Sequence, residues 1–205
     1  SLSSIWVCKN SSLLYNSATS QGGVVLLANG KVEFLKSLIT NNYALSGTII
    51  YDASITQSNI SIIDNDIKYN GHIMDTLVGG VIALYCHFSS CMTYFMNNKV
   101  TYNKAEKGGV IYQHSGSSFV LVKNNIFNTN EAKEGGVFNT HGISEIKTNY
   151  FTNNIASQGG CIYTEIGSNM LTSQNTFNRN TAREYGGVFK INSRDFIISN
   201  NQIDY

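Results

Sequence analysis

One repeat motif recurs along the chain and constrains its fold more than any other feature. In its clearest copy, from Phe151 to Ile162, a phenylalanine is followed by an asparagine three residues on, an alanine two residues further, and a Gly-Gly pair that leads into an apolar segment. The first glycine of successive copies stands at positions 22, 47, 79, 108, 135, 159 and 186, which are 24 to 32 residues apart. Repeats of this length are typical of solenoids, propellers and repeat arrays.

The residues between these motifs favour strands. They form short β-branched and aromatic runs separated by turn residues, without helical periodicity. We therefore predict an all-β fold, a right-handed parallel β-helix (a pectin-lyase-like solenoid) of about seven coils with three short strands each. Because neither end carries a polar cap, we expect residues 1–205 to be a single β-helix segment of a longer protein, with both ends cut within a coil.

Side chains at equivalent positions of successive repeats should stack in columns, and alternate residues of each strand should point inward. The inward column expected after the glycines contains Val25, Ile49, Ile82, Ile111, Phe138, Ile162 and Phe189. Two series of asparagines are predicted to stack as ladders at the corners, where we expect them to adopt the left-handed backbone of a sharp turn. The first series is Asn65, Asn98, Asn125, Asn149, Asn175 and Asn201; the second is Asn16, Asn42, Asn70, Asn103, Asn130, Asn154 and Asn180.

Composition and charge exclude two classes of partner. Only 13% of the residues are charged and the formal net charge is +1, so neither nucleic acid nor an anionic membrane surface is indicated. No apolar run approaches the roughly 20 residues that span a bilayer, so we expect no membrane span in this segment.

The four cysteines form neither a disulfide framework nor a zinc-type pair. Cys8 and Cys161 occupy repeat positions that are apolar elsewhere, so we expect buried thiols. Cys86 and Cys91 flank four residues of one loop, a spacing that allows a local disulfide without requiring it.

The outward column of the strand before the motif suggests a binding surface. In this column Tyr94, Leu121, Leu171 and Ile197 form a predicted apolar stripe, and exposed apolar area usually marks an interface. The longest loops, Met74 to Gly79 and Tyr85 to Ser90, are a second candidate for partner contact. Two carboxylates of the same column, Glu33 and Glu145, are four coils and therefore roughly 19 Å apart, which is too far for a glycosidase pair.

A weaker candidate lies five residues after the second glycine, where His114, His141 and Glu165 follow one another on adjacent coils. Stacked side chains of this kind could hold a divalent metal or act as acid and base. The alternative, which we prefer, is that they are exposed turn residues, because metal ligands must converge. We therefore predict no catalytic, metal or cofactor site.

The motif also resembles the repeats of chlamydial polymorphic membrane proteins and of large surface proteins of protists. The resemblance rests on Phe127 to Asn130 with Gly135 to Phe138, on Phe151 to Asn154 with Gly159 to Ile162, and on Phe177 to Asn180 with Gly186 to Phe189. It implies a secreted or surface-displayed stalk or adhesin that has no catalytic activity.

Together these features predict a non-catalytic structural or adhesive scaffold module of a large extracellular or cell-surface protein, with other proteins, further domains of the same chain, or glycans as partners. The alternative is a carbohydrate-binding or carbohydrate-cleaving β-helix with its site near His114, His141 and Glu165. Asn10 and Asn59 begin Asn-x-Ser sequons, so both are candidate N-glycosylation sites if the chain enters the secretory route.

Overall fold

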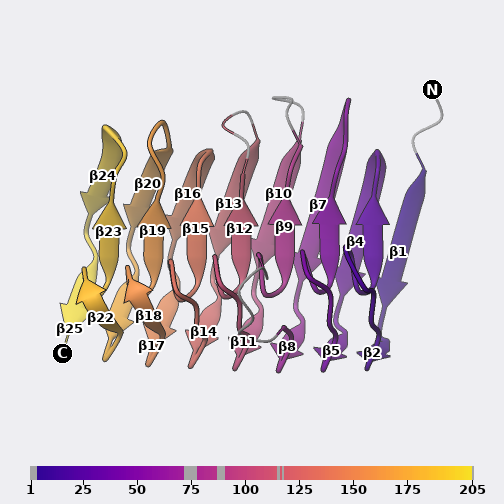
Figure 1. Ribbon diagram of the computed structural model, residues 1–205, viewed down its shortest axis with the longest axis horizontal. Coiled ribbons are helices and arrows are strands. Elements are labelled where there is room, and N and C mark those ends of the chain that lie inside the picture. The colour runs from indigo at the N-terminus through magenta and orange to yellow at the C-terminus, as the bar shows by residue number, and fades with distance from the viewer. Residues whose placement is uncertain (1–3, 72–77, 87–90, 115, 117, 205) are drawn as a thin grey trace.

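The chain winds as a right-handed parallel β-helix of about seven coils, in agreement with the sequence (Figure 1). The computed structural model describes residues 4–71, 78–86, 91–114, 116 and 118–204. Three parallel sheets run along the solenoid, and each coil contributes one strand to each sheet. Within the described ranges no helix is present that could cross a membrane.

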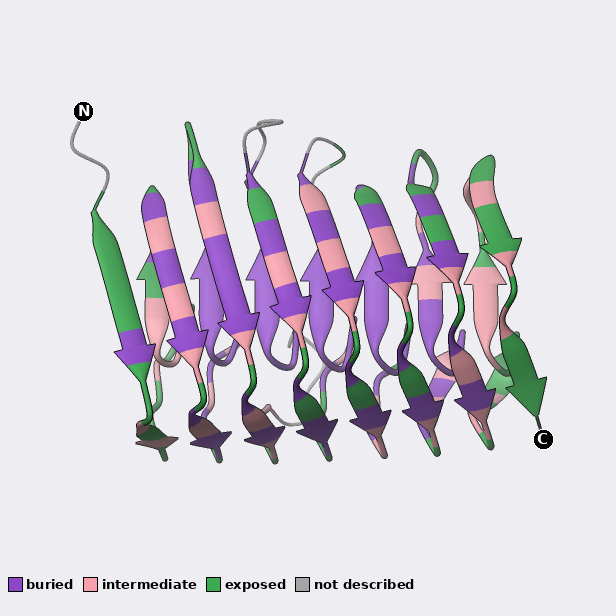
Figure 2. Ribbon diagram, turned by 180° about the vertical axis from the view of Figure 1, so that it is seen from behind, coloured by how far each residue is buried: buried purple, intermediate pink, exposed green. Residues whose placement is uncertain are grey.

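The first sheet holds the longest strands. Its members are β1 (Ile5–Lys9), β4 (Gly30–Leu35), β7 (Ser58–Ile63), β10 (Met92–Met96), β13 (Phe119–Lys123), β16 (Ile143–Lys147), β20 (Asn169–Ser173) and β24 (Asp195–Ser199). All neighbours pair in parallel, with equivalent residues of successive repeats directly opposite each other. Buried residues alternate with more exposed ones along most of these strands (Figure 2), as the inward and outward columns require.

The second sheet carries the aromatic core. Its strands are β2 (Ser12–Leu14), β5 (Leu38–Thr40), β8 (Asp66–Lys68), β11 (Lys99–Thr101), β14 (Ile126–Asn128), β17 (Tyr150–Thr152), β21 (Thr176–Asn178) and β25 (Gln202–Asp204). Their central residues point inward, and Phe127, Phe151 and Phe177 stack with ring centroids 4.9 and 4.6 Å apart. Stacked rings fill the interior because the repeat places a phenylalanine at the equivalent position of consecutive coils.

The third sheet follows the glycines and corrects one predicted column. Its strands are β3 (Val25–Leu27), β6 (Ile50–Asp52), β9 (Ile82–Leu84), β12 (Ile111–Gln113), β15 (Phe138–Thr140), β19 (Ile162–Thr164) and β23 (Phe189–Ile191). Val25 lies opposite Ile50, so Ile50 takes the place assigned to Ile49. The reason is that every strand of this sheet begins three residues after the first glycine, and Ile49 is only two residues after Gly47.

A short fourth ladder, not expected from the sequence, pairs β18 (Ile155–Gln158) with β22 (Thr181–Tyr185). Isolated bridges such as Lys104 to Glu131 continue it along earlier coils. These bridges tie together the turns that lead into the glycines, so backbone hydrogen bonding extends beyond the three main sheets.

Both asparagine ladders are continuous, as predicted, and their members are buried except Asn16, Asn180 and Asn201 at the ends. For example, the Oδ1 atom of Asn130 accepts two hydrogen bonds from Asn103, one from the backbone N–H at 3.0 Å and one from the side-chain Nδ2 at 3.1 Å. The left-handed residue, however, is the one that precedes each ladder asparagine. Thr129 (φ 55°) and Thr148 (φ 56°) are examples. The turn is made one residue earlier, which leaves the asparagine itself free to direct its amide along the solenoid axis.

The two glycines of each pair serve different purposes. The first is left-handed, as Gly135 is with φ of 64°. The second allows close approach between coils, because a Cβ on Gly136 would lie 2.3 Å from the carbonyl oxygen of Gly160. Thr48 is the exception at this position, and its hydroxyl donates to the carbonyl of Gly80.

Candidate functional site

The outward face of the first sheet contains the predicted apolar stripe. Tyr94 lies opposite Leu121, and Leu171 lies opposite Ile197. Glu145 stands between Leu121 and Leu171 in the same column and interrupts the stripe. Its carboxylate lies 2.7 Å from Lys147 Nζ on the same strand, so its charge is balanced locally. The structure thus brings the four stripe residues into one column, in two separate pairs.

A second outward column, which the sequence analysis did not consider, widens this surface. Met92, Phe119 and Ile143 lie opposite one another, two residues before the stripe on β10, β13 and β16. Met92 is 40% exposed and Ile143 is 44% exposed. The same two-residue alternation that identified the stripe could have revealed this column. We call the combined surface the apolar face; it consists of Met92, Tyr94, Phe119, Leu121, Ile143, Leu171 and Ile197.

Polar groups border the apolar face. Lys123 and Lys147 lie opposite each other at the ends of β13 and β16, on its outward side. Asn59 lies opposite Met92 on the neighbouring strand β7. A glycan on Asn59 would therefore lie beside the apolar face, whereas Asn10 is an exposed residue of the turn after β1.

The predicted ladder of His114, His141 and Glu165 is in register along the backbone, but the side chains of His114 and Glu165 have different partners. Consecutive coils are hydrogen bonded here, with Glu165 N–H donating to the Thr140 carbonyl at 2.8 Å. His114 Nδ1 lies 3.0 Å from the Tyr112 hydroxyl, whereas the Glu165 carboxylate faces Lys107 Nζ at 3.7 Å. Among the described residues these three do not form a group close enough to share a metal ion.

A tyrosine cluster next to this ladder was not predicted. Tyr85 stacks on Tyr51 with centroids 5.0 Å apart and lies 5.8 Å from Tyr112 and 4.8 Å from His114. Tyr51 and Tyr112 lie in one column of the third sheet, on either side of Ala83. Tyr85 lies outside that column, after the end of β9, so the column alone did not indicate the cluster. Burial and then the neighbouring Tyr112 phenol raise the pKa of Tyr85 to about 12. Burial and then the charge of Glu165 also raise the pKa of Tyr112. The phenols are therefore neutral hydrogen-bonding groups at physiological pH.

Lys107 joins this cluster to two carboxylates. Its Nζ lies 3.0 Å from Glu134 and 3.7 Å from Glu165. Burial lowers the pKa of Lys107, but the hydrogen bond and charge of Glu134 outweigh burial and raise it overall. An ammonium, two carboxylates and neutral phenols can hydrogen bond a polar ligand.

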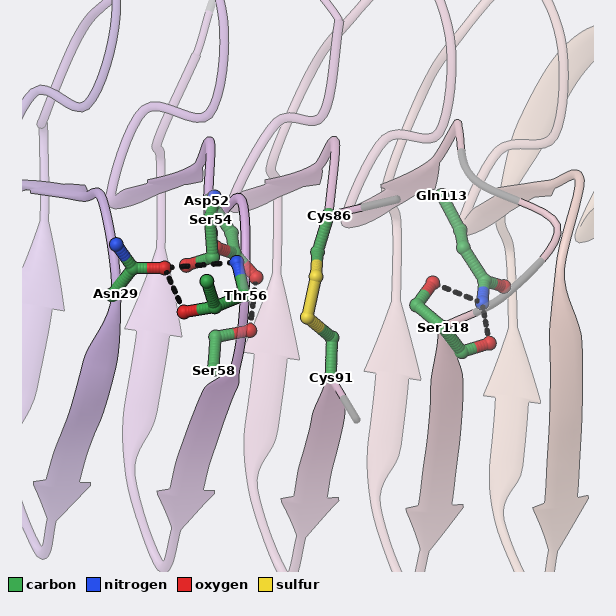
Figure 3. The surroundings of a disulfide bond; sticks show 9 residues. All are labelled: Asn29, Asp52, Ser54, Thr56, Ser58, Cys86, Cys91, Gln113 and Ser118. Carbon is green, nitrogen blue, oxygen red and sulfur yellow. Dashed lines mark hydrogen bonds between the residues drawn. A yellow bond between two sulfur atoms is a disulfide. The ribbon is translucent and has the colours of Figure 1, made fainter. Parts of the chain in front are cut away.

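The third candidate region is the corner where the third sheet leads into the first. Cys86 lies two residues after the end of β9, and Cys91 lies one residue before β10. The two cysteines form a buried disulfide with a Cα–Cα distance of 6.3 Å. Figure 3 shows this disulfide near the buried side chain of Asp52. Cys8 and Cys161 are buried free thiols, and burial raises the pKa of Cys161 well above its usual value. In the two predicted contact loops, residues 74–77 and 87–90 lie outside the described residues.

Comparisons with known proteins add no homologue to this description. No family model matches the chain, and neither a curated protein nor a solved structure matches it significantly.

Proposed function

We propose that this protein is a non-catalytic scaffold module, structural or adhesive, of a large extracellular or cell-surface protein, and that it binds protein partners along the apolar face. The observation that carries the proposal is the alignment of large apolar side chains on the outside of a rigid sheet. Met92 and Leu171 are 40% and 36% exposed, although alternate residues of the same strands, such as Phe95 and Met170, are buried in the core.

The composition of the apolar face suits a protein interface. Interface cores are enriched in aromatic residues and methionine, and here Tyr94, Phe119 and Met92 lie together on two adjacent strands. Register pairing holds these side chains at a regular spacing of about 4.8 Å, so little conformational entropy is lost when a partner binds. Lys123 at the border favours a partner that has an acidic group beside its apolar surface, whereas Lys147 is already paired with Glu145.

Two further observations support the extracellular part of the proposal. The repeat motif resembles those of chlamydial polymorphic membrane proteins and protist surface proteins, which implies a displayed stalk or adhesin. The Cys86–Cys91 disulfide is also of a kind that persists in oxidising compartments.

The proposal is tested by site-specific photo-cross-linking in the native setting of the protein. A photoreactive phenylalanine analogue at Leu121 should cross-link to another protein or to another domain of the same chain. The matched control carries the analogue at Tyr150, which is 42% exposed on the second sheet. Leu121→Lys should abolish binding of the cross-linked partner. Equal cross-linking at both positions, or none at Leu121, would contradict the proposal.

The tyrosine cluster favours a second candidate function, carbohydrate binding or cleavage on the third sheet. Sugars pack against aromatic rings and hydrogen bond to charged groups, and Tyr85, Lys107 and Glu134 offer both kinds of contact on neighbouring coils. Binding to a glycan array, lost in Tyr85→Ala and kept in Leu121→Lys, would establish this function. Release of reducing sugars that depends on Glu134 and Glu165 would show cleavage.

A further inference from the structure

A buried carboxylate lies at the corner closed by the disulfide. Asp52 is the last residue of β6 and is 1% exposed. Equivalent positions on the two neighbouring coils hold Leu27 and Leu84, so the repeat does not require a charge there. The Asp52 carboxylate accepts hydrogen bonds from the backbone N–H of Ser54 at 3.0 Å and from the Ser58 hydroxyl at 2.5 Å.

Those two hydrogen bonds leave the charge of Asp52 without a cation. None of the ion pairs found among the described residues includes this carboxylate. A buried charge is costly unless it is paired or coordinates a metal. The Ser54 hydroxyl oxygen, at the same corner, is also buried and has no hydrogen-bond partner within the described part of the chain. The corner therefore holds more polar groups than its internal hydrogen bonds use.

Two sulfur atoms lie next to this carboxylate. One carboxylate oxygen of Asp52 and the Sγ atoms of Cys86 and Cys91 all lie within 4.8 Å of one another. In a tetrahedral zinc site, with Zn–S near 2.3 Å and Zn–O near 2.1 Å, ligand atoms are about 3.5–3.8 Å apart. The Cα–Cα distance of 6.3 Å between the cysteines allows their sulfurs to move to that separation once the disulfide is open.

We propose that reduction of the Cys86–Cys91 disulfide creates a site for a thiophilic divalent cation such as Zn²⁺. The ligands are the two cysteine thiolates and the Asp52 carboxylate, and a water molecule completes the tetrahedron. Two thiolates and one carboxylate carry three negative charges. A divalent cation balances two of them, so the loaded site would have a net charge of −1.

The chemistry balances with a dithiol as reductant. The dithiol supplies two electrons and two protons, the Cys86–Cys91 S–S bond breaks, and the reductant becomes its own disulfide. Each cysteine is then a thiol, and binding of the cation releases both protons to water. Reoxidation removes the two sulfur ligands and expels the cation. The corner between the third and first sheets is thus closed covalently in the oxidised protein and by the metal in the reduced protein.

The test compares cobalt and zinc binding by the oxidised chain and by the chain reduced with dithiothreitol, which is then removed under anaerobic conditions. Reduced protein should bind one equivalent of Co²⁺, with visible bands of tetrahedral geometry and thiolate charge transfer. Competition with a chromophoric chelator should show Zn²⁺ binding at least 100-fold tighter than in the oxidised protein.

Variants assign the ligands. Asp52→Asn, which preserves the side-chain shape, should weaken Zn²⁺ binding at least tenfold, and Cys86→Ser with Cys91→Ser should abolish it. Replacing both free thiols, Cys8→Ser with Cys161→Ser, should leave binding unchanged. X-ray absorption of the zinc-loaded wild type should show two sulfur ligands near 2.3 Å and two oxygen ligands, independently of how any variant folds. Absence of redox-dependent binding, or a wild-type site with a different ligand set, would overturn the proposal.

Discussion

Replacing Asn130 by alanine should destabilise the solenoid far more than the same change at the end of the same ladder. Asn130 is fully buried, and its Oδ1 accepts two hydrogen bonds from Asn103. Its Nδ2 donates to the Val100 carbonyl and to Asn154 Oδ1, both at 3.1 Å. Alanine would leave the Asn103 N–H buried without an acceptor, at a cost of about 1–3 kcal/mol, and would remove three further hydrogen bonds worth about 0.5–1.5 kcal/mol each. The expected loss of unfolding free energy is about 4 kcal/mol.

The control is Asn16→Ala at the N-terminal end of the same ladder. Asn16 is exposed, and its side chain donates one hydrogen bond, to Asn42 Oδ1 at 2.9 Å. Its loss should cost less than about 1 kcal/mol, because water can replace the partner.

Urea unfolding, followed by far-UV circular dichroism and tyrosine fluorescence, measures both variants. With an m-value of about 2 kcal/mol per molar urea, the midpoint should fall by about 2 M for Asn130→Ala and by less than about 0.5 M for Asn16→Ala. Coincident transitions from the two probes justify the free-energy comparison. Equal shifts for the two variants would refute the reasoning, since the backbone ladders alone would then hold the corners.

Three further predictions follow from the backbone and from the tyrosine cluster. Gly136→Ala should lower the melting temperature strongly, because the added Cβ would lie 2.3 Å from the Gly160 carbonyl oxygen. Gly116→Ala, whose Cβ would have its nearest contact at 3.5 Å, should change the melting temperature little. Equal shifts for the two variants would contradict this prediction. Thr148→Asn should raise stability by about 0.5–1 kcal/mol in urea unfolding, because asparagine tolerates φ of 56° better than a β-branched residue; a loss of stability would show that the turn is unstrained. Because the pKa of Tyr85 is raised from 10.0 to about 12, the unfolded chain releases this proton first, so Tyr85 should stabilise the fold below pH 10 and lose that contribution between pH 10 and 12. Spectrophotometric titration should show one high-pKa phenol fewer in Tyr85→Phe, and an unchanged titration would contradict the assignment.

The sequence predicted those parts of the fold that depend on equivalent positions of the repeat. Columns such as Tyr94 and Leu121 are fixed by equal spacing from the motif, so they could be derived without coordinates. The column after the glycines shows the limit of that derivation. Ile49 was placed in it instead of Ile50, because residues must be counted from the first glycine in every coil. The left-handed residues were assigned one position too late because asparagine is favoured both in such turns and in amide ladders.

Groups of residues from non-equivalent positions could not be predicted in this way. Tyr85 reaches Tyr51 and Tyr112 from beyond the end of its strand, and Asp52 meets Cys86 at a corner whose loop length varies among coils. These contacts depend on how far each loop extends from the stacked strands, and residue spacing alone does not determine that distance.

The separation of inward and outward columns explains why a scaffold of this type can gain a binding surface at little cost. Stability resides in the inward side chains and the amide ladders, so outward residues are constrained only by solubility and by their partners. Leu121 lies between buried Val120 and Val122 on β13, yet a lysine at position 121 can extend its charged end into water, whereas one at either neighbour would place a charge in the core. Loss of binding in Leu121→Lys with unchanged unfolding would therefore report on the interface itself. The same reasoning makes Asp52 unusual, because it places a carboxylate at an inward position. Stability alone would favour a leucine there, as at the equivalent positions Leu27 and Leu84 of the adjacent coils.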